Sequence, residues 1–110
     1  MPRLGLAVVR GRSMQPSLYD GDRLLVLHGV APRPGRLVVV RLPDGVVAVK
    51  RAHHRHAGGW WVERDNPREG VDSWLVGAVP DERVLARVLL RVWPWRRGGL
   101  RALSRGPRSS

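Results

Sequence analysis

A valine-rich β-hairpin is the feature of this sequence that most constrains its fold. Residues 37–42 and 46–52 are two apolar segments separated by Pro43-Asp44-Gly45. Asp-Gly is typical of a type I′ turn, because both central residues of that turn need a positive φ. We therefore predict that the two segments pair as antiparallel strands, with the continuous apolar run at 37–42 buried inside the sheet.

Further short apolar segments, separated by Gly and Pro, indicate that the chain is mostly β. We predict strands at residues 4–10, 23–27, 60–63 and 84–93, and an additional apolar segment at 74–79. The spacing at 84–93 also suits one face of a helix, but a strand is favoured in an all-β context. We expect no helix, and the predicted fold is a small, partly open β-barrel without a transmembrane helix.

The length of 110 residues is that of one domain. We predict a folded domain at residues 1–95 and a disordered tail at 96–110, which is rich in Gly, Ser, Arg and Pro. The tail holds five arginines and no acid, so the formal charge of the first 95 residues is +11 − 5 = +6. The sequence has no cysteine, which excludes disulfides and thiolate metal sites.

One lysine stands out in a chain that otherwise uses only arginine. Of the 20 Lys and Arg residues, 19 are arginine, and the exception is Lys50. Arginine stays charged near neutral pH, whereas burial among apolar side chains lowers the pKa of a lysine by several units. A neutral lysine beside a serine hydroxyl can activate that hydroxyl as a nucleophile.

The predicted strand gives Lys50 apolar neighbours on its own face. Alternation along the strand puts Val46, Ala48 and Lys50 on one side. If that side is buried, the ammonium loses its water. In the alternative interpretation, the aliphatic stem packs against the sheet while the ammonium reaches solvent.

Five short motifs follow one another along this chain. They are Gly11-Arg12-Ser13-Met14-Gln15-Pro16-Ser17-Leu18, Gly21-Asp22, Val49-Lys50-Arg51, Asp65-Asn66 and Asp72-Ser73 with Gly77 and Val79. In this order they resemble the motifs of the type I signal peptidase family, which are serine proteases with a Ser-Lys dyad, and the resemblance covers residues 8–94. The first motif also resembles the self-cleaving repressor peptidases, but only 12 residues precede Ser13, so we do not expect self-cleavage.

Within that family, the chain is most similar to the short, soluble proteases proposed to mature nickel-type superoxide dismutase. Shared features are Val-Lys-Arg, a Trp-containing strand, Asp-Asn-Pro and Asp-Ser. The resemblance implies a serine endopeptidase that removes an N-terminal leader from a precursor protein, with nickel superoxide dismutase as the expected substrate. It implies no cofactor.

The resemblance also implies a role for each residue of these motifs. Ser13 would be the nucleophile, with its backbone N–H as an oxyanion donor, and Lys50 the general base. Supporting roles fall to Gly11 for close backbone approach, Met14 and Pro16 for the wall and turn, Arg51 for anchoring the lysine strand, and Asp65, Asn66 and Asp72 for holding the loop behind the lysine.

Two positions depart from the family pattern. Gly70 stands where larger members have a serine that orients the lysine, so Ser73 or water would have to do so here. Trp74 replaces an arginine that commonly follows the Asp-Ser pair.

The histidines and the positive net charge suggest other possible functions. His54 and His56 would share a strand face and could chelate a metal ion with His53 or His28. Trp93, Trp95 and the Arg-rich tail suit an anionic membrane interface. The alternatives are therefore a signal-peptidase-like protease at a membrane surface, or an inactive basic β-domain that binds anionic membrane or nucleic acid. Nucleic-acid binding would rest on net charge alone.

The sequence also predicts where the protein acts. No apolar run approaches the ~18 residues of a membrane span, and the first residues lack the apolar region of a secretory signal. We expect a cytoplasmic protein that is peripheral to a membrane in the alternative case.

Overall fold

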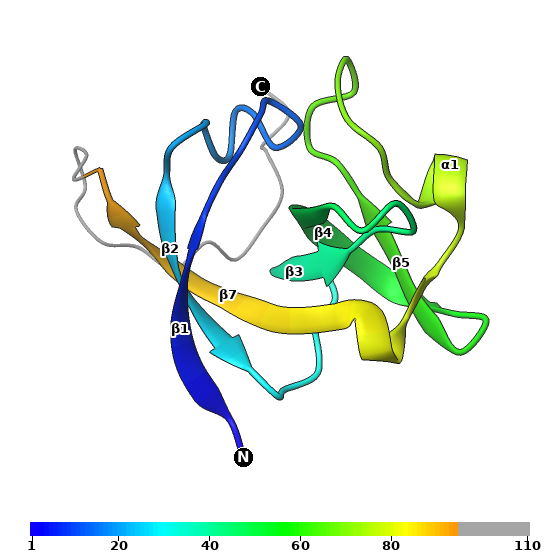
Figure 1. Cartoon of the computed structure of the whole chain (residues 1–110). Coiled ribbons are helices and arrows are strands. Elements are labelled where there is room, and N and C mark those ends of the chain that lie inside the picture. The colour runs from blue at the N-terminus through cyan, green and yellow to red at the C-terminus, as the bar shows by residue number, and fades with distance from the viewer. Residues whose placement is uncertain (95–110) are drawn as a thin grey trace.

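A single curled antiparallel sheet organises the protein (Figure 1). The computed structural model describes residues 1–94, and the predicted tail at 96–110 lies outside them. The elements are β1 (Arg3–Val8), β2 (Arg23–His28), β3 (Leu37–Arg41), β4 (Val47–His56), β5 (Gly59–Glu63), α1 (Ser73–Val76), β6 (Val79–Pro80), the 3-10 helix η1 (Asp81–Arg83) and β7 (Val84–Trp93).

The seven strands are hydrogen-bonded in the order β1-β2-β7-β3-β4-β5-β6. Every neighbouring pair is antiparallel, and β1 and β6 remain as edges. Figure 1 shows β7 crossing the molecule between the β1–β2 side and the β4–β5 side. The predicted mostly β, partly open barrel is confirmed, and no helix in residues 1–94 has the length and apolarity to cross a membrane.

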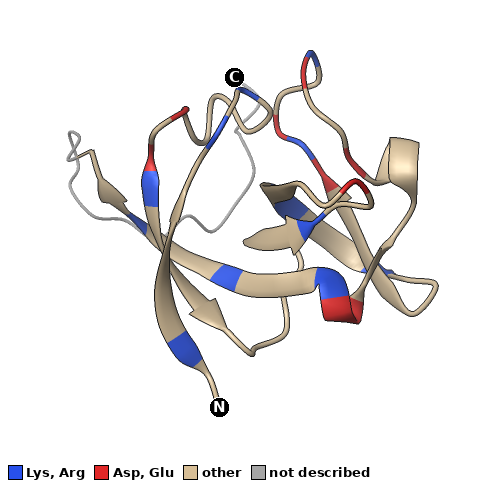
Figure 2. Ribbon diagram, in the orientation of Figure 1, with Lys and Arg blue, Asp and Glu red and all other residues tan. Residues whose placement is uncertain are grey.

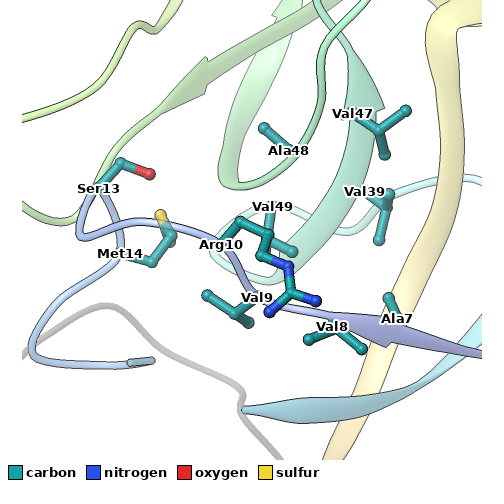
Figure 3. A pocket seen from close by; sticks show the side chains of 10 residues that line it. All are labelled: Ala7, Val8, Val9, Arg10, Ser13, Met14, Val39, Val47, Ala48 and Val49. Carbon is teal, nitrogen blue, oxygen red and sulfur yellow. The ribbon is translucent and has the colours of Figure 1, made fainter. Parts of the chain in front are cut away.

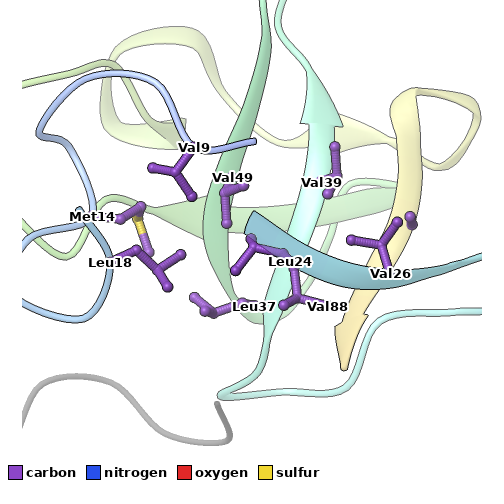
Figure 4. Close-up of a cluster of buried hydrophobic side chains, with 10 residues drawn as sticks. Val9, Met14, Leu18, Leu24, Val26, Leu37, Val39, Val49 and Val88 are labelled. Atoms are coloured by element: carbon purple, nitrogen blue, oxygen red, sulfur yellow. The ribbon is translucent and has the colours of Figure 1, made fainter. Parts of the chain in front are cut away.

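Strand β3 is buried on both faces, which explains its continuous apolar sequence. Leu37 and Val39 belong to a cluster that includes residues of β2, β4, β7 and the loop after β1 (Figure 4). Val38 and Val40 point the other way, into a second cluster with residues of β5 and β6. The alternation along one strand therefore fills two cores of the curled sheet.

The β3–β4 hairpin forms as predicted, but its turn is of a different type. Only Gly45 of the three turn residues has a positive φ, of 89°. The Gly45 N–H donates to the Leu42 carbonyl and the Leu42 N–H to the Val46 carbonyl, both at 2.8 Å. This is a type I turn followed by a left-handed glycine, which suits the fixed negative φ of Pro43.

The type I′ turn lies instead between β4 and β5. Ala57 and Gly58 are its central residues, with positive φ values of 49° and 77°. Gly59 belongs to β5, where a Cβ atom would lie 2.2 Å from the Val79 carbonyl oxygen of β6. Glycine is needed there because the two strands approach too closely for any side chain.

The expectation that the chain holds no helix was wrong. Residues 73–76 form one turn of helix, α1, because the Asp72 carboxylate caps it by accepting the Trp74 N–H at 3.1 Å. The histidines at 53–56 continue β4. The predicted buried face was only partly right, because Val46 is 53 % exposed whereas Lys50 is 2 % exposed.

Candidate functional site

Ser13 lies in the loop that joins β1 to β2. The loop is fixed by hydrogen bonds from the Gly11 N–H to Asp20 Oδ1 at 2.7 Å and from the Val9 N–H to the Asp22 carbonyl at 2.8 Å. Met14 and Leu18 anchor it in the first core cluster, and a cis peptide bond precedes Pro16. The residues on either side of Ser13 are therefore tied down.

Lys50 reaches this serine from the middle of β4. Its Nζ donates a hydrogen bond to Ser13 Oγ at 3.2 Å, and no other hydrogen-bond partner lies within the part of the chain that the structure describes. Burial lowers the pKa of Lys50 below its usual 10.5; the Asp72 carboxylate raises this pKa and the Arg64 guanidinium lowers it. An amine so placed can accept a proton from the hydroxyl.

The loop at residues 64–72 encloses the serine from the opposite side. The Asn66 N–H donates to the Ser13 carbonyl at 2.7 Å, and Asn66 Nδ2 donates to the Arg12 carbonyl at 2.9 Å. Asn66 thus holds the serine loop, in addition to shaping its own turn by accepting the Arg68 N–H.

Gly70 packs directly against Ser13. A Cβ atom on Gly70 would lie 2.4 Å from Ser13 Cβ and 3.4 Å from both Ser13 Oγ and Lys50 Nζ. Its φ is +96°, a conformation that L side chains rarely adopt. The departure from the serine of larger relatives therefore has a local reason: this backbone leaves no room for a side chain.

A buried ion pair fastens the lysine strand to both loops. Arg51 Nη2 lies 2.7 Å from Asp65 Oδ2, with side chains only 3 % and 5 % exposed. Ser17 donates to the same oxygen at 2.6 Å, and Arg51 Nη1 donates to the Gly35 carbonyl at 3.0 Å. The loops after β1 and β5 are thereby joined to β4 through one cluster.

Asp72 and Ser73 connect the same loop to α1 and β5. Asp72 accepts hydrogen bonds from the Arg64 N–H at 3.2 Å and pairs with Arg64 Nη1 at 3.1 Å. Ser73 Oγ accepts the Val62 N–H at 2.8 Å. Trp74 is 72 % exposed, and its Nε1 donates to Glu63.

With this geometry in place, the chain can be compared with known proteins. Residues 2–85 match the family described as Peptidase S24-like. The chain belongs to this family. A mitochondrial inner membrane protease subunit 1 from Xenopus tropicalis is 27 % identical over an alignment 115 positions long, and the match covers 81 % of this chain and 69 % of the relative. Both matches support a signal-peptidase-like protease, and neither bears on superoxide dismutase maturation.

The S24-like domain has a cleft of about 290 Å³ at Ser13 and Lys50. Two ionic residues of its wall, Arg12 and Glu69, form an ion pair at 3.6 Å. A smaller cavity of about 50 Å³ adjoins Ser13, and Figure 3 shows its mostly apolar walls. Its lining includes Ala7, Val39, Val47, Ala48 and Val49.

Several residues of these cavities were not singled out from the sequence. Arg10, Val47 and Glu69 line them, yet none carries a motif of its own. They come from segments on either side of the matched motifs. These residues could be identified only from the structure, which brings β1, β4 and the loop at 64–72 together around Ser13.

The histidines of this S24-like domain serve as part of an aromatic surface. A bulge after Ala52 displaces His53, whose Nε2 lies 3.6 Å from Glu63 Oε1. The His54 ring stacks on Trp61 at 6.2 Å, and the His56 ring meets Trp61 edge-on at 5.4 Å. Residues 1–94 contain no group of three His, Asp or Glu side chains able to hold a metal ion, so the predicted third ligand is not brought to this pair.

Proposed function

We propose that the protein is a serine endopeptidase in which Ser13 is the nucleophile and Lys50 the general base. The observation that carries the proposal is the 3.2 Å contact between Lys50 Nζ and Ser13 Oγ, with the lysine 2 % exposed. Desolvation favours the neutral amine, which is the form that can accept a proton.

In the first step, Ser13 Oγ attacks the carbonyl carbon of the substrate while Lys50 takes the hydroxyl proton. The negative charge then moves to the carbonyl oxygen. No acceptor within residues 1–94 takes the Ser13 backbone N–H, so this donor is free to bind that oxyanion, a contribution of about 3–4 kcal/mol in comparable sites.

The second half of the cycle uses the same two groups. The Lys50 ammonium gives its proton to the leaving amine, and the peptide bond breaks to leave an acyl-serine. Lys50, neutral again, takes a proton from water as the water attacks the ester. The acid product leaves, and the proton returns to Ser13 Oγ.

The cavities support an extended peptide as the substrate. The apolar cavity of about 50 Å³ beside Ser13 suits a small side chain next to the bond that is cut. The order of the sequence motifs supports the leader of a precursor protein, and the pattern at residues 49–51, 60–61, 65–67 and 72–73 supports nickel-type superoxide dismutase as that precursor.

The test is incubation with such a precursor, followed by mass measurement of the products. We expect the native protein to release an N-terminal leader, and both Ser13→Ala and Lys50→Arg to be inactive, because arginine cannot lose its proton. Ser17→Ala is the matched control, since Ser17 lies in the same loop and bonds Asp65 instead of Lys50. Cleavage by folded Ser13→Ala would refute the mechanism.

A second candidate, action at an anionic membrane surface, is favoured by the outer face of β1. Leu4, Leu6 and Val8 are 66 %, 71 % and 42 % exposed. Trp93 is 52 % exposed, with Arg23 stacked on its ring at 4.8 Å. Figure 2 shows basic residues on β1, β2 and β7, where no acidic residue occurs.

Co-sedimentation with phosphatidylglycerol vesicles tests this candidate, with phosphatidylcholine vesicles and a DNA duplex as comparisons. Binding to phosphatidylglycerol alone, weakened by Leu4→Ser with Leu6→Ser, would support it. Equal binding to DNA would favour a purely electrostatic attraction. Trp95 and the Arg-rich tail lie outside the described residues, and the cytoplasmic location stays a prediction.

A further inference from the structure

Besides the Ser13 cleft and the small apolar cavity beside Ser13, the protein has a separate cavity of about 290 Å³, which we call the second cavity. Its walls come from four places in the fold: Arg41 and Pro43 at the β3–β4 turn, Val76 at the end of α1, Val79 on β6 and Arg83 on η1. Arg83 Nη1 donates to the Leu42 carbonyl at 3.4 Å, which joins η1 to the turn.

The second cavity and the Ser13 cleft are lined by neighbouring residues of the same two segments. On one side, the β3–β4 turn gives Asp44 and Val46 to the Ser13 cleft and Pro43 to the second cavity. On the other side, the segment entering and forming α1 gives Val71 to the cleft and Val76 to the cavity. Figure 1 shows the β3–β4 turn beside α1. A peptide that extended from Ser13 along these two segments would reach the second cavity.

The charge of the second cavity differs from that of the cleft. In the cleft, Arg10 and Arg12 are balanced by Asp44 and Glu69. The second cavity is lined by Arg41 and Arg83, with apolar residues and no acid. The nearby Asp81 carboxylate is paired with Arg55.

Two arginines among apolar lining residues have the chemistry that a carboxylate site needs. Guanidinium groups bind carboxylates through paired, charge-assisted hydrogen bonds, and the apolar surroundings strengthen that attraction. We propose that this cavity is a specificity subsite that binds an acidic side chain of the substrate, on the far side of the scissile bond from the residue held in the small apolar cavity. The proposal rests on the peptidase function proposed above.

The experiment compares cleavage of a peptide series. Every peptide has alanine on the N-terminal side of the bond that is cut. Glu, Gln or Lys is placed in turn at each of the six positions on the C-terminal side of that bond. We expect Glu at one position to raise kcat/KM roughly 10-fold over Gln, as for a hydrogen bond to a charged group, and the preference to shrink as salt is added.

Substitutions of Arg41 and Arg83 then test whether the second cavity causes the preference for Glu. Arg41→Gln with Arg83→Gln should remove the preference for Glu while leaving cleavage of the Gln peptide unchanged, and Arg41→Glu with Arg83→Glu should reverse it toward Lys. Arg91→Gln, on β7, is the matched control and should keep the preference. Thermal melting checks that each variant is folded.

The outcomes separate this inference from the proposed function. Cleavage of the series by the native protein without any preference for Glu would overturn the subsite and leave the peptidase intact. A preference that survives in the double Gln variant would also overturn it. Cleavage of no peptide and no precursor would overturn both proposals.

Discussion

Replacing Gly70 with alanine should disable the protein through the position of Ser13. Adding one Cβ atom places a carbon 2.4 Å from Ser13 Cβ, whereas two carbons in contact lie about 3.5–4.0 Å apart. One of the two loops must therefore move by about 1 Å. The Ser13 loop has little freedom to do so, because Asn66 holds its carbonyl oxygen at 2.7 Å.

The size of the effect follows from that displacement. A misplacement of about 1 Å in a catalytic group costs about 100-fold in rate, so we expect kcat/KM of Gly70→Ala to fall by about that factor. The positive φ of +96° adds about 1–3 kcal/mol of strain to any non-glycine residue. Gly70→Ser should behave like Gly70→Ala, although serine is the residue found in larger relatives.

Gly58→Ala separates strain from displacement. Gly58 also has a positive φ, of +77°, but a Cβ atom there would meet nothing within 4 Å. We expect Gly58→Ala to lose stability in thermal melting while its kcat/KM on the precursor stays within twofold of the native value. If Gly70→Ala were as active as Gly58→Ala, the steric reasoning would be refuted.

Three further predictions concern Lys50 and the buried ion pair. Because burial lowers the pKa of Lys50 from 10.5 and the neutral amine is the proposed base, kcat/KM should rise with pH and level off below pH 10.5; a maximum at acidic pH would contradict this. For the same reason, the buried Lys50 lowers the stability of the folded protein. This cost is complete at pH values below the folded pKa of Lys50 and disappears above its unfolded pKa. Lys50→Met should therefore melt at a higher temperature than the native protein at neutral pH, and a lower melting temperature would count against the desolvation of Lys50. Asp65→Asn leaves the 3 % exposed Arg51 without its carboxylate partner. It should lower the free energy of unfolding, measured in urea, by about 3–5 kcal/mol. The control Asp44→Asn, at an exposed position, should lower it by less than about 0.5 kcal/mol.

Local patterns predicted most of the sheet because the responsible interactions are close in sequence. The β3–β4 hairpin joins neighbouring segments, and their register follows from the short turn between them. The turn type was missed because Pro43 outweighed the Asp-Gly pair. The helix α1 was missed because it is a single turn that depends on the cap from Asp72, and Asp72 lies outside the apolar run at 74–79.

The candidate site was partly visible from the sequence. Ser13 and Lys50 could be named from a motif and from the use of a single lysine. The placement of Gly70 against Ser13 could not, since 57 residues separate them and no local pattern encodes their approach. Nor did the sequence predict that Asn66 would bind the serine loop.

The sequence by itself determined a mostly β chain and indicated one amine and one hydroxyl as candidates for a reacting pair, because strand alternation and side-chain chemistry are local properties. Only the tertiary structure decided that these two groups lie 3.2 Å apart. It also decided that Lys50 is buried and that neighbouring residues of the same two segments line two separate cavities. Distance, burial and cavity shape depend on segments distant in sequence, which only packing brings together.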